Sequence, residues 1–269
     1  MPDMASARRD LLTIFQAALS RVEGRRCVRE SLQQAPGPVS LIAIGKAAQS
    51  MAEGALDALG DQVVDGLLIS KAGHLDGAVF ATRGITCLEG GHPVPDERSL
   101  LAGRELVEFI QSQPPERYLL FLISGGTSGL VEQLRDGIDL KALQRVNEWL
   151  LGSGLPIDGM NRVRKSLSQI KGGGLIPYLQ GRPAQVLLIS DVPKDDPGVI
   201  GSGLLVAEVD SPKSLDDLRL PDWMTALLPA TPREQPTTAG NIQIRIVASL
   251  ADARQAAADK AGELGYQVT

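Results

Sequence analysis

"FLISGGTSGLV", residues 121–131, ends an apolar run that begins at Tyr118 and stops at Ser124. Three glycines and three hydroxyl residues follow within residues 124–129. An apolar strand that ends in such small residues can present successive backbone N–H groups to an anion, and the residues after it can begin a helix. The alternative interpretation is a tight structural turn, because glycine clusters form turns in many proteins.

Short apolar runs of this kind alternate with helical patterns along the chain. We predict strands at 39–44, 63–69, 84–88, 118–123 and 186–190, and helices at 11–22, 96–110, 140–151 and 158–170. Strands of about five or six residues separated by helices indicate βαβ units. The predicted fold class is therefore α/β, with a mostly parallel sheet and helices on both faces. Ligands of such sheets bind at the carboxyl ends of the strands.

Composition narrows the class of protein. The chain has 269 residues, of which 43% are hydrophobic, enough for one large domain or for one domain and a smaller piece. The net charge of −5, without a basic stripe, argues against nucleic acid as a partner. Two cysteines without metal-ligand spacing fit a reducing cytoplasm. The charged N-terminus does not read as a signal peptide, and we expect no membrane span.

The pattern changes near residue 206. Prolines and a polar run between residues 206 and 241 predict a connection. A strand at 242–247 and a helix at 250–264 follow it. We therefore predict a first domain over residues 1–229, a linker at 230–241, and the beginning of an incomplete second α/β domain at 242–269.

Lys46 is a candidate anion-binding residue. It follows the predicted strand 39–44 directly, at the start of a helical pattern. Free N–H groups at a helix N-terminus attract anions, and an ammonium group there adds to the attraction. The segment is not a P-loop, because Ser40 and Ala47 stand where a glycine and a Ser or Thr are needed, and the chain has no G-x-G-x-x-G. The alternative interpretation is a surface lysine beside a turn.

A predicted helix carries several cations on one face. Asn161, Arg164 and Lys165 share a polar face by their spacing, and Lys171 follows just before three glycines. Such a face is usually solvated, although it can also line a phosphate site.

Acidic residues follow a predicted strand. Asp191 comes directly after it, with Asp195 and Asp196 close behind. Carboxylates in this position can hold Mg²⁺ together with phosphate oxygens, or can cap a loop. In another loop His92 can hydrogen-bond a substrate, and Asp96 resembles the N-cap of the next helix.

Five motifs together resemble the glycerate 2-kinase family, whose C-terminal part is called the MOFRL domain. They are "IAIGKAA" (42–48), "EGGHPVPDERS" (89–99), "LISGGTSGL" (122–130), "MNRVRKSLSQIKGGGL" (160–175) and "LISDVPKDDPGVIGSG" (188–203). Their order and spacing resemble the family over roughly residues 10–205. The resemblance implies a Rossmann-like N-terminal domain, a second α/β domain, and an active site in the cleft between them. It also implies phosphorylation of D-glycerate at its 2-hydroxyl, with ATP and Mg²⁺.

The resemblance assigns roles to matching residues. It implies catalytic roles for Lys46, Asp191 and Asp196, and a Mg²⁺ site at Asp191 and Asp195. It implies substrate or phosphate binding by Ser124, Gly125, Gly126, Thr127, Ser128, Asn161, Arg164, Lys165, Lys171 and His92. The sequence departs from the family pattern at Lys194 and Leu204, where the family tends to have glycine and proline, and at Leu250, where it usually has asparagine.

Two other functions stay open at this stage. One is an oxidoreductase of the hydroxypyruvate reductase type, against which the missing G-x-G-x-x-G argues. The other is a non-catalytic fragment that keeps an anion pocket. The expected partners are a small substrate and a nucleotide, and the oligomeric state is open, a homodimer included.

Overall fold

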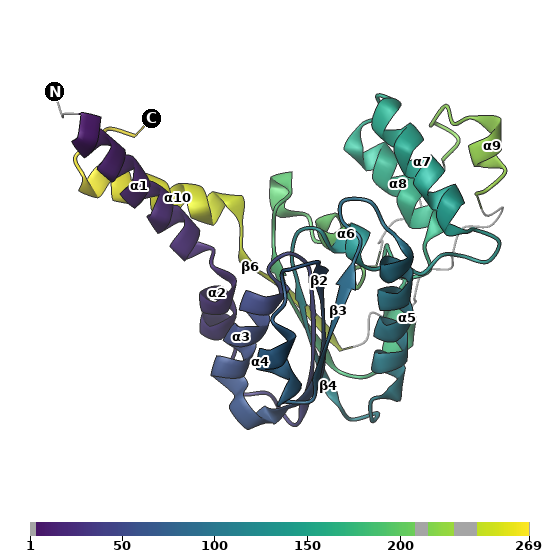
Figure 1. The fold of residues 1–269 in the computed structure, drawn as a ribbon, viewed down its shortest axis with the longest axis horizontal. Coiled ribbons are helices and arrows are strands. Elements are labelled where there is room, and N and C mark those ends of the chain that lie inside the picture. The colour runs from purple at the N-terminus through teal and green to yellow at the C-terminus, as the bar shows by residue number, and fades with distance from the viewer. Residues whose placement is uncertain (1–3, 208–214, 229–240, 269) are drawn as a thin grey trace.

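A computed structural model describes residues 4–207, 215–228 and 241–268. Its six described strands form one sheet in the order β3-β2-β1-β4-β5-β6, and every pair of neighbours is parallel. The strands are β1 (Val39–Ile44), β2 (Val63–Lys71), β3 (Ile85–Gly90), β4 (Tyr118–Ile123), β5 (Ala184–Ile189) and β6 (Ile242–Ala248). The predicted α/β fold class is confirmed, with helices on both sides of the sheet (Figure 1).

The described helices begin with an N-terminal pair and continue between the strands. They are α1 (Met4–Arg21), α2 (Gly24–Ser31), α3 (Ala48–Leu59), α4 (Gly77–Ala81), α5 (Glu97–Ser112), α6 (Thr127–Leu130), α7 (Leu140–Gly152), α8 (Ile157–Leu167), α9 (Asp222–Thr225) and α10 (Leu250–Glu263). None of these helices is long and apolar enough to cross a membrane.

Alternate residues of each central strand enter two different cores. In β1, Leu41 and Ala43 pack with Met51 of α3, whereas Ile42 and Ile44 pack on the side of Leu106 in α5. All six residues of β1 are buried. A parallel strand covered by helices on both faces is apolar throughout, which is why these strands are visible as continuous runs in the sequence.

The strand order places β1 and β4 side by side although they are far apart in sequence. From β1 the chain builds outward through β2 to β3, and from β4 it builds in the opposite direction through β5 to β6. Ile44 at the end of β1 is in register with Ile123 at the end of β4. The loops that follow these two strands therefore flank the point where the strand order reverses, which is where open α/β sheets form a ligand crevice.

The position of β6 bears on the predicted domain boundary. The predicted strand at 242–247 is β6, which pairs in parallel with β5, and Ala184 lies opposite Ile242. The division of the chain at residue 242 stays a prediction. The proline-rich connection before it resembles a domain linker in composition. Residues 230–240 of the predicted linker lie outside the described residues.

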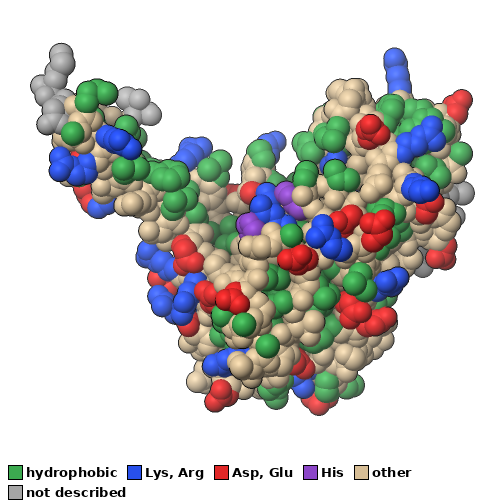
Figure 2. All heavy atoms as spheres, viewed as in Figure 1, with side chains coloured by type: hydrophobic (Ala, Val, Ile, Leu, Met, Phe, Trp, Pro, Cys, Tyr) green, Lys and Arg blue, Asp and Glu red, His purple; other side chains and the backbone are tan. Residues whose placement is uncertain are grey.

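Two helical units rise above the carboxyl edge of the sheet. One is the arm formed by α1 and α10, in which Arg21 pairs with Asp252 at 3.0 Å and neither helix has a buried residue. The other is formed by α7, α8 and α9 around Leu143, Val163 and Met224. Figure 2 shows a hollow between the two units, with histidine, lysine or arginine side chains gathered at its floor.

Candidate functional site

The loop after β1 is bound to the loop after β4. Gly45 has φ of 130°, and a Cβ there would lie 2.7 Å from the carbonyl oxygen of Ser124, so only glycine fits. The N–H of Lys46 donates to the carbonyl of Gly125 at 2.9 Å, and the N–H of Ala47 donates to Ser124 Oγ at 3.1 Å. These bonds fix Lys46 beside the glycine pair.

Two hydroxyls of the predicted anion loop support the loop itself. Thr127 is fully buried, and its Oγ1 donates to the carbonyls of Ile44 at 3.0 Å and Ser124 at 2.8 Å. Ser124 is 2% exposed and accepts the bond from Ala47. The hydroxyls of Ser128 and Ser202 form a short hydrogen bond with each other. Ser202 lies in the predicted motif 188–203, but its role in holding this loop was missed.

Gly125 and Gly126 carry the contacts that define the site. A Cβ on Gly125 would lie 2.8 Å from Cγ of Asp191, so the carboxylate of Asp191 rests on this glycine. A Cβ on Gly126 would lie 3.2 Å from both His92 Nε2 and Lys46 Cε. Lys46, His92 and Asp191 therefore converge on the two glycines from the ends of three different strands.

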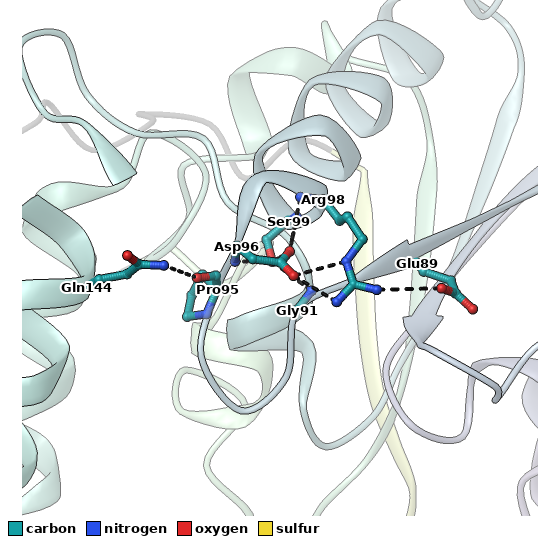
Figure 3. Close-up of polar contacts among 7 residues, drawn as sticks. All are labelled: Glu89, Gly91, Pro95, Asp96, Arg98, Ser99 and Gln144. Carbon is teal, nitrogen blue, oxygen red and sulfur yellow. Dashed lines mark hydrogen bonds and ion pairs between the residues drawn. The ribbon is translucent and has the colours of Figure 1, made fainter. Parts of the chain in front are cut away.

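The loop that carries His92 is fixed at the start of α5. Asp96 is the N-cap of this helix, as predicted, and accepts from the N–H groups of Arg98 and Ser99 (Figure 3). Ser99 Oγ accepts from the N–H of Gly91 at 2.9 Å, and Arg98 pairs with Asp96 at 2.7 Å and approaches Glu89 at 3.7 Å. Because these bonds hold both ends of the segment, His92 is presented by a defined loop.

Electrostatics distinguishes the two ionisable groups of this loop. Burial by itself would raise the pKa of Asp96, but the hydrogen bonds from Arg98 and Ser99 outweigh it and the pKa is lowered. Burial also lowers the pKa of His92, and the positive charges of Lys46, Lys71 and His74 lower it further. His92 is therefore a neutral imidazole at neutral pH.

Lys171 lies in a buried pair. The lysine is 3% exposed, its ammonium group contacts the carboxylate of Glu132, and Glu132 is fully buried. Ser168 Oγ donates to the other carboxylate oxygen at 2.5 Å. The sequence pattern missed Glu132, since no local periodicity relates it to a lysine 39 positions later. The structure places Lys171 in this network, so its phosphate-binding role stays a prediction.

The polar face of α8 is directed at α7. Arg164 Nε donates to Asn147 Oδ1 at 2.8 Å, and its Nη1 donates to Asn161 Oδ1 at 3.4 Å. Burial lowers the pKa of Arg164. Lys165 is half-buried on the same helix. The contacts of Asn161 and Arg164 thus lie within the α7–α9 unit, whereas Lys46 and His92 lie at the ends of the strands.

The acidic residues after β5 occupy a sharply turned loop. Lys194 and Asp195 have φ of 70° and 52°, in the left-handed region, and Asp196 Oδ1 accepts from the N–H of Gly198 at 2.8 Å. Across residues 4–207, 215–228 and 241–268, no group of three His, Cys, Asp or Glu side chains is arranged to hold a metal ion. Mg²⁺ bound through one or two carboxylates and phosphate oxygens does not need such a group, and Asp191 beside Gly125 has the chemistry for it.

Fold and site together define a class of protein. A parallel sheet with a glycine-rich loop and a lysine at its switch point is an arrangement that Rossmann-like α/β proteins use to bind phosphate-bearing or carboxylate ligands. More specifically, the chain belongs to the family described as "Domain of unknown function (DUF4147)", which matches residues 10–220.

Known relatives confirm the resemblance to glycerate kinases. The chain is 32% identical to a D-glycerate 2-kinase of Thermotoga maritima, over 99% of its own length and 64% of that protein. It is 37% identical to a putative hydroxypyruvate reductase of Agrobacterium vitis, over 97% of its length and 60% of that protein. The crystal structure of a glycerate kinase from Thermotoga maritima superposes with a TM-score of 0.83 at 29% identity, covering 98% of this chain and 64% of that one. The chain thus spans less than two thirds of each of these proteins.

Proposed function

We propose that this protein transfers a phosphoryl group from ATP to the 2-hydroxyl of D-glycerate, which gives 2-phosphoglycerate. The observation that carries the proposal is the convergence of Lys46, His92 and Asp191 on Gly125 and Gly126 at the switch point. The relative named D-glycerate 2-kinase supports the choice of substrate, since its similarity extends over 99% of this chain.

The residues of the site suit the needs of phosphoryl transfer. Such reactions depend on positioning and on neutralising negative charge, with little covalent help from the protein. In this proposal the ammonium of Lys46 and the N–H groups of Gly125 and Gly126 bind anionic oxygens. Asp191 holds Mg²⁺, and the exposed carboxylate of Asp196 orients the 2-hydroxyl. ATP with Mg²⁺ supplies the phosphoryl group.

The direct test measures ADP release in a coupled assay with D-glycerate, ATP and Mg²⁺, followed by identification of the product. Replacement Lys46→Ala is expected to lower kcat/KM by about 100-fold or more, because it removes a cation from the site of developing charge. Lys141→Ala is the matched control, since Lys141 is an exposed lysine on α7. Equal turnover by the wild type and Lys46→Ala would remove the lysine from the mechanism.

The second candidate function is reduction of hydroxypyruvate. The relative named putative hydroxypyruvate reductase favours it, whereas the β1 turn "GKAA" lacks the glycine pattern of nicotinamide sites. The loss of NADH absorbance in the presence of hydroxypyruvate separates the two functions. The third candidate is an anion-binding fragment without catalysis, for which D-glycerate would raise Tm while ADP release stays at background.

The setting of the reaction is proposed on the same basis. Both cysteines are free thiols, with Cys27 buried, which suits a reducing cytoplasm. The proposed partners are D-glycerate and the nucleotide. Sedimentation at several protein concentrations decides between a monomer and a homodimer.

A further inference from the structure

Both histidines of the chain gather near one lysine at the edge of the sheet. The imidazole of His92 and the side chain of Lys46 lie against the same glycine, Gly126. His74 Nδ1 lies 3.5 Å from the carbonyl oxygen of Lys46. Lys71 ends β2, three residues before His74, and its charge acts on His92. The four side chains come from the ends of β1, β2 and β3, and Figure 2 shows histidine beside lysine or arginine there.

The carboxylates nearest to this cluster have other partners. Asp96 is bonded to Arg98, and Glu89 accepts from the N–H of Gly73 at 3.1 Å and lies 3.7 Å from Arg98. Asp191 rests on Gly125. Among the residues that the structure describes, no carboxylate lies within salt-bridge distance of Lys46 or Lys71. The cluster therefore holds net positive charge beside the half-buried Gly126.

A bound anion would offset the positive charge of this cluster. Lys46 lies against Gly126 together with His92, and Lys71 and His74 lie close enough for their charges to act on His92. The two ammonium groups repel one another, and a dianion between them would offset that repulsion. His92 is the member that can respond to the anion, because burial and, after it, nearby positive charge lower its pKa in the free protein. A dianion beside it offsets both effects, so the imidazolium becomes the favoured form.

We propose that Lys71 and His74 bind the same anionic group as Lys46 and His92, and that His92 takes up one proton from the solvent when a phosphoryl group binds there. The inference rests on the proposed function and extends it to two residues outside the motifs. The direction of the pH dependence follows from the linkage between proton uptake and anion binding. Affinity for the anion rises as the pH falls from 8 until His92 of the free protein is itself protonated, and is constant below that pH.

The test uses sulfate, a dianion that does not itself titrate in this pH range, and NMR of the imidazole groups. The sequence has two histidines, so His74→Asn assigns both signals at once. The expected result is that saturating sulfate raises the pKa of His92 by about one unit or more, which corresponds to about tenfold tighter binding at pH 5.5 than at pH 8. An unchanged pKa of His92 at saturating sulfate overturns the inference.

Variants test the two added residues. Lys71→Met and His74→Asn are each expected to raise the Kd for sulfate about fivefold or more at pH 6, whereas Lys141→Met on α7 leaves it unchanged. Equal affinities in all variants would show that the site is Lys46 and His92 alone. Binding of sulfate with a shifted His92, but no turnover of D-glycerate, would reject the kinase function and keep the inference. Turnover of D-glycerate without a change in the pKa of His92 would keep the kinase function and reject the inference.

Discussion

At the scale of single residues, we expect stability to depend strongly on the buried pair of Glu132 and Lys171. Glu132→Gln removes the negative charge beside an ammonium group that is 3% exposed. We expect a loss of about 3–5 kcal/mol in the free energy of unfolding, because an unpaired buried charge remains. Urea unfolding measures it. The double variant Glu132→Leu with Lys171→Met is expected to recover most of the loss, and a single variant that costs under about 1 kcal/mol would mean that water reaches the pair.

Substitutions at two glycines of the site are expected to have different effects, one on stability and the other on activity. Gly45→Ala meets the carbonyl of Ser124 and a φ of 130°, so we expect a loss of about 2 kcal/mol or more in stability. Gly125→Ala meets only the carboxylate end of Asp191, which can rotate away. We expect the Tm of Gly125→Ala to change by only a few degrees, which corresponds to about 1 kcal/mol of stability. Its kcat is expected to fall. Gly37→Ala, with open space around it, is the control. An active Gly125→Ala enzyme would argue against a role for Asp191.

The candidate residues whose position sequence alone could predict are those that follow local rules. Lys46, Gly125, Gly126 and Asp191 sit where parallel strands end, and strand ends are visible as the points where apolar runs stop. The sequence did not predict the role of Glu132, because tertiary packing and not a local pattern brings it to its partner Lys171. A buried carboxylate and a solvated one have the same letter in a sequence.

At the scale of elements, the N-cap of α5 links the stability of that helix to pH. Asp96→Ala is expected to cost about 1 kcal/mol, because the N–H groups of Arg98 and Ser99 lose their acceptor. The pKa of Asp96 is lowered in the folded protein. Its contribution is therefore full above the unfolded carboxyl pKa, near 3.9, and is lost as the pH falls through the folded value. Thermal unfolding between about pH 2 and 7, which extends below the unfolded value, tests it. A constant difference between variant and wild type over that range would contradict the linkage.

The strands were predictable within a few residues because they are continuous apolar runs, and α5, α7, α8 and α10 because their apolar residues recur at helical spacing. The sequence did not predict α2, α4 or α9, and α1 begins seven residues before its predicted start at residue 11. Helix α8 shows where this fails. Its apolar spacing continues to Ile170, but the helix ends at Leu167 and Ser168 turns inward to Glu132. A competing side-chain bond from serine ends the helix before the periodicity does. The sequence contains that serine but not its distant acceptor.

At the scale of the whole molecule, β6 decides how the chain can be divided. If residues 242–269 began a separate domain, a protein of residues 1–229 would be as stable as the full chain. Because β6 covers the edge of β5, the shorter protein is expected to lose stability and to aggregate through the open edge. Urea unfolding and light scattering of the two proteins at equal concentration measure this. Equal midpoints and clear solutions would support the predicted boundary.

The arm of α1 and α10 has a mechanical consequence. Tyr266 donates to Asp10 at 2.8 Å, so the two ends of the described chain lie at the same tip, far from the strands (Figure 1). Tension applied to both ends pulls these two helices apart from the tip inward, and it breaks their contacts one after another. The strands carry no load until the arm has opened.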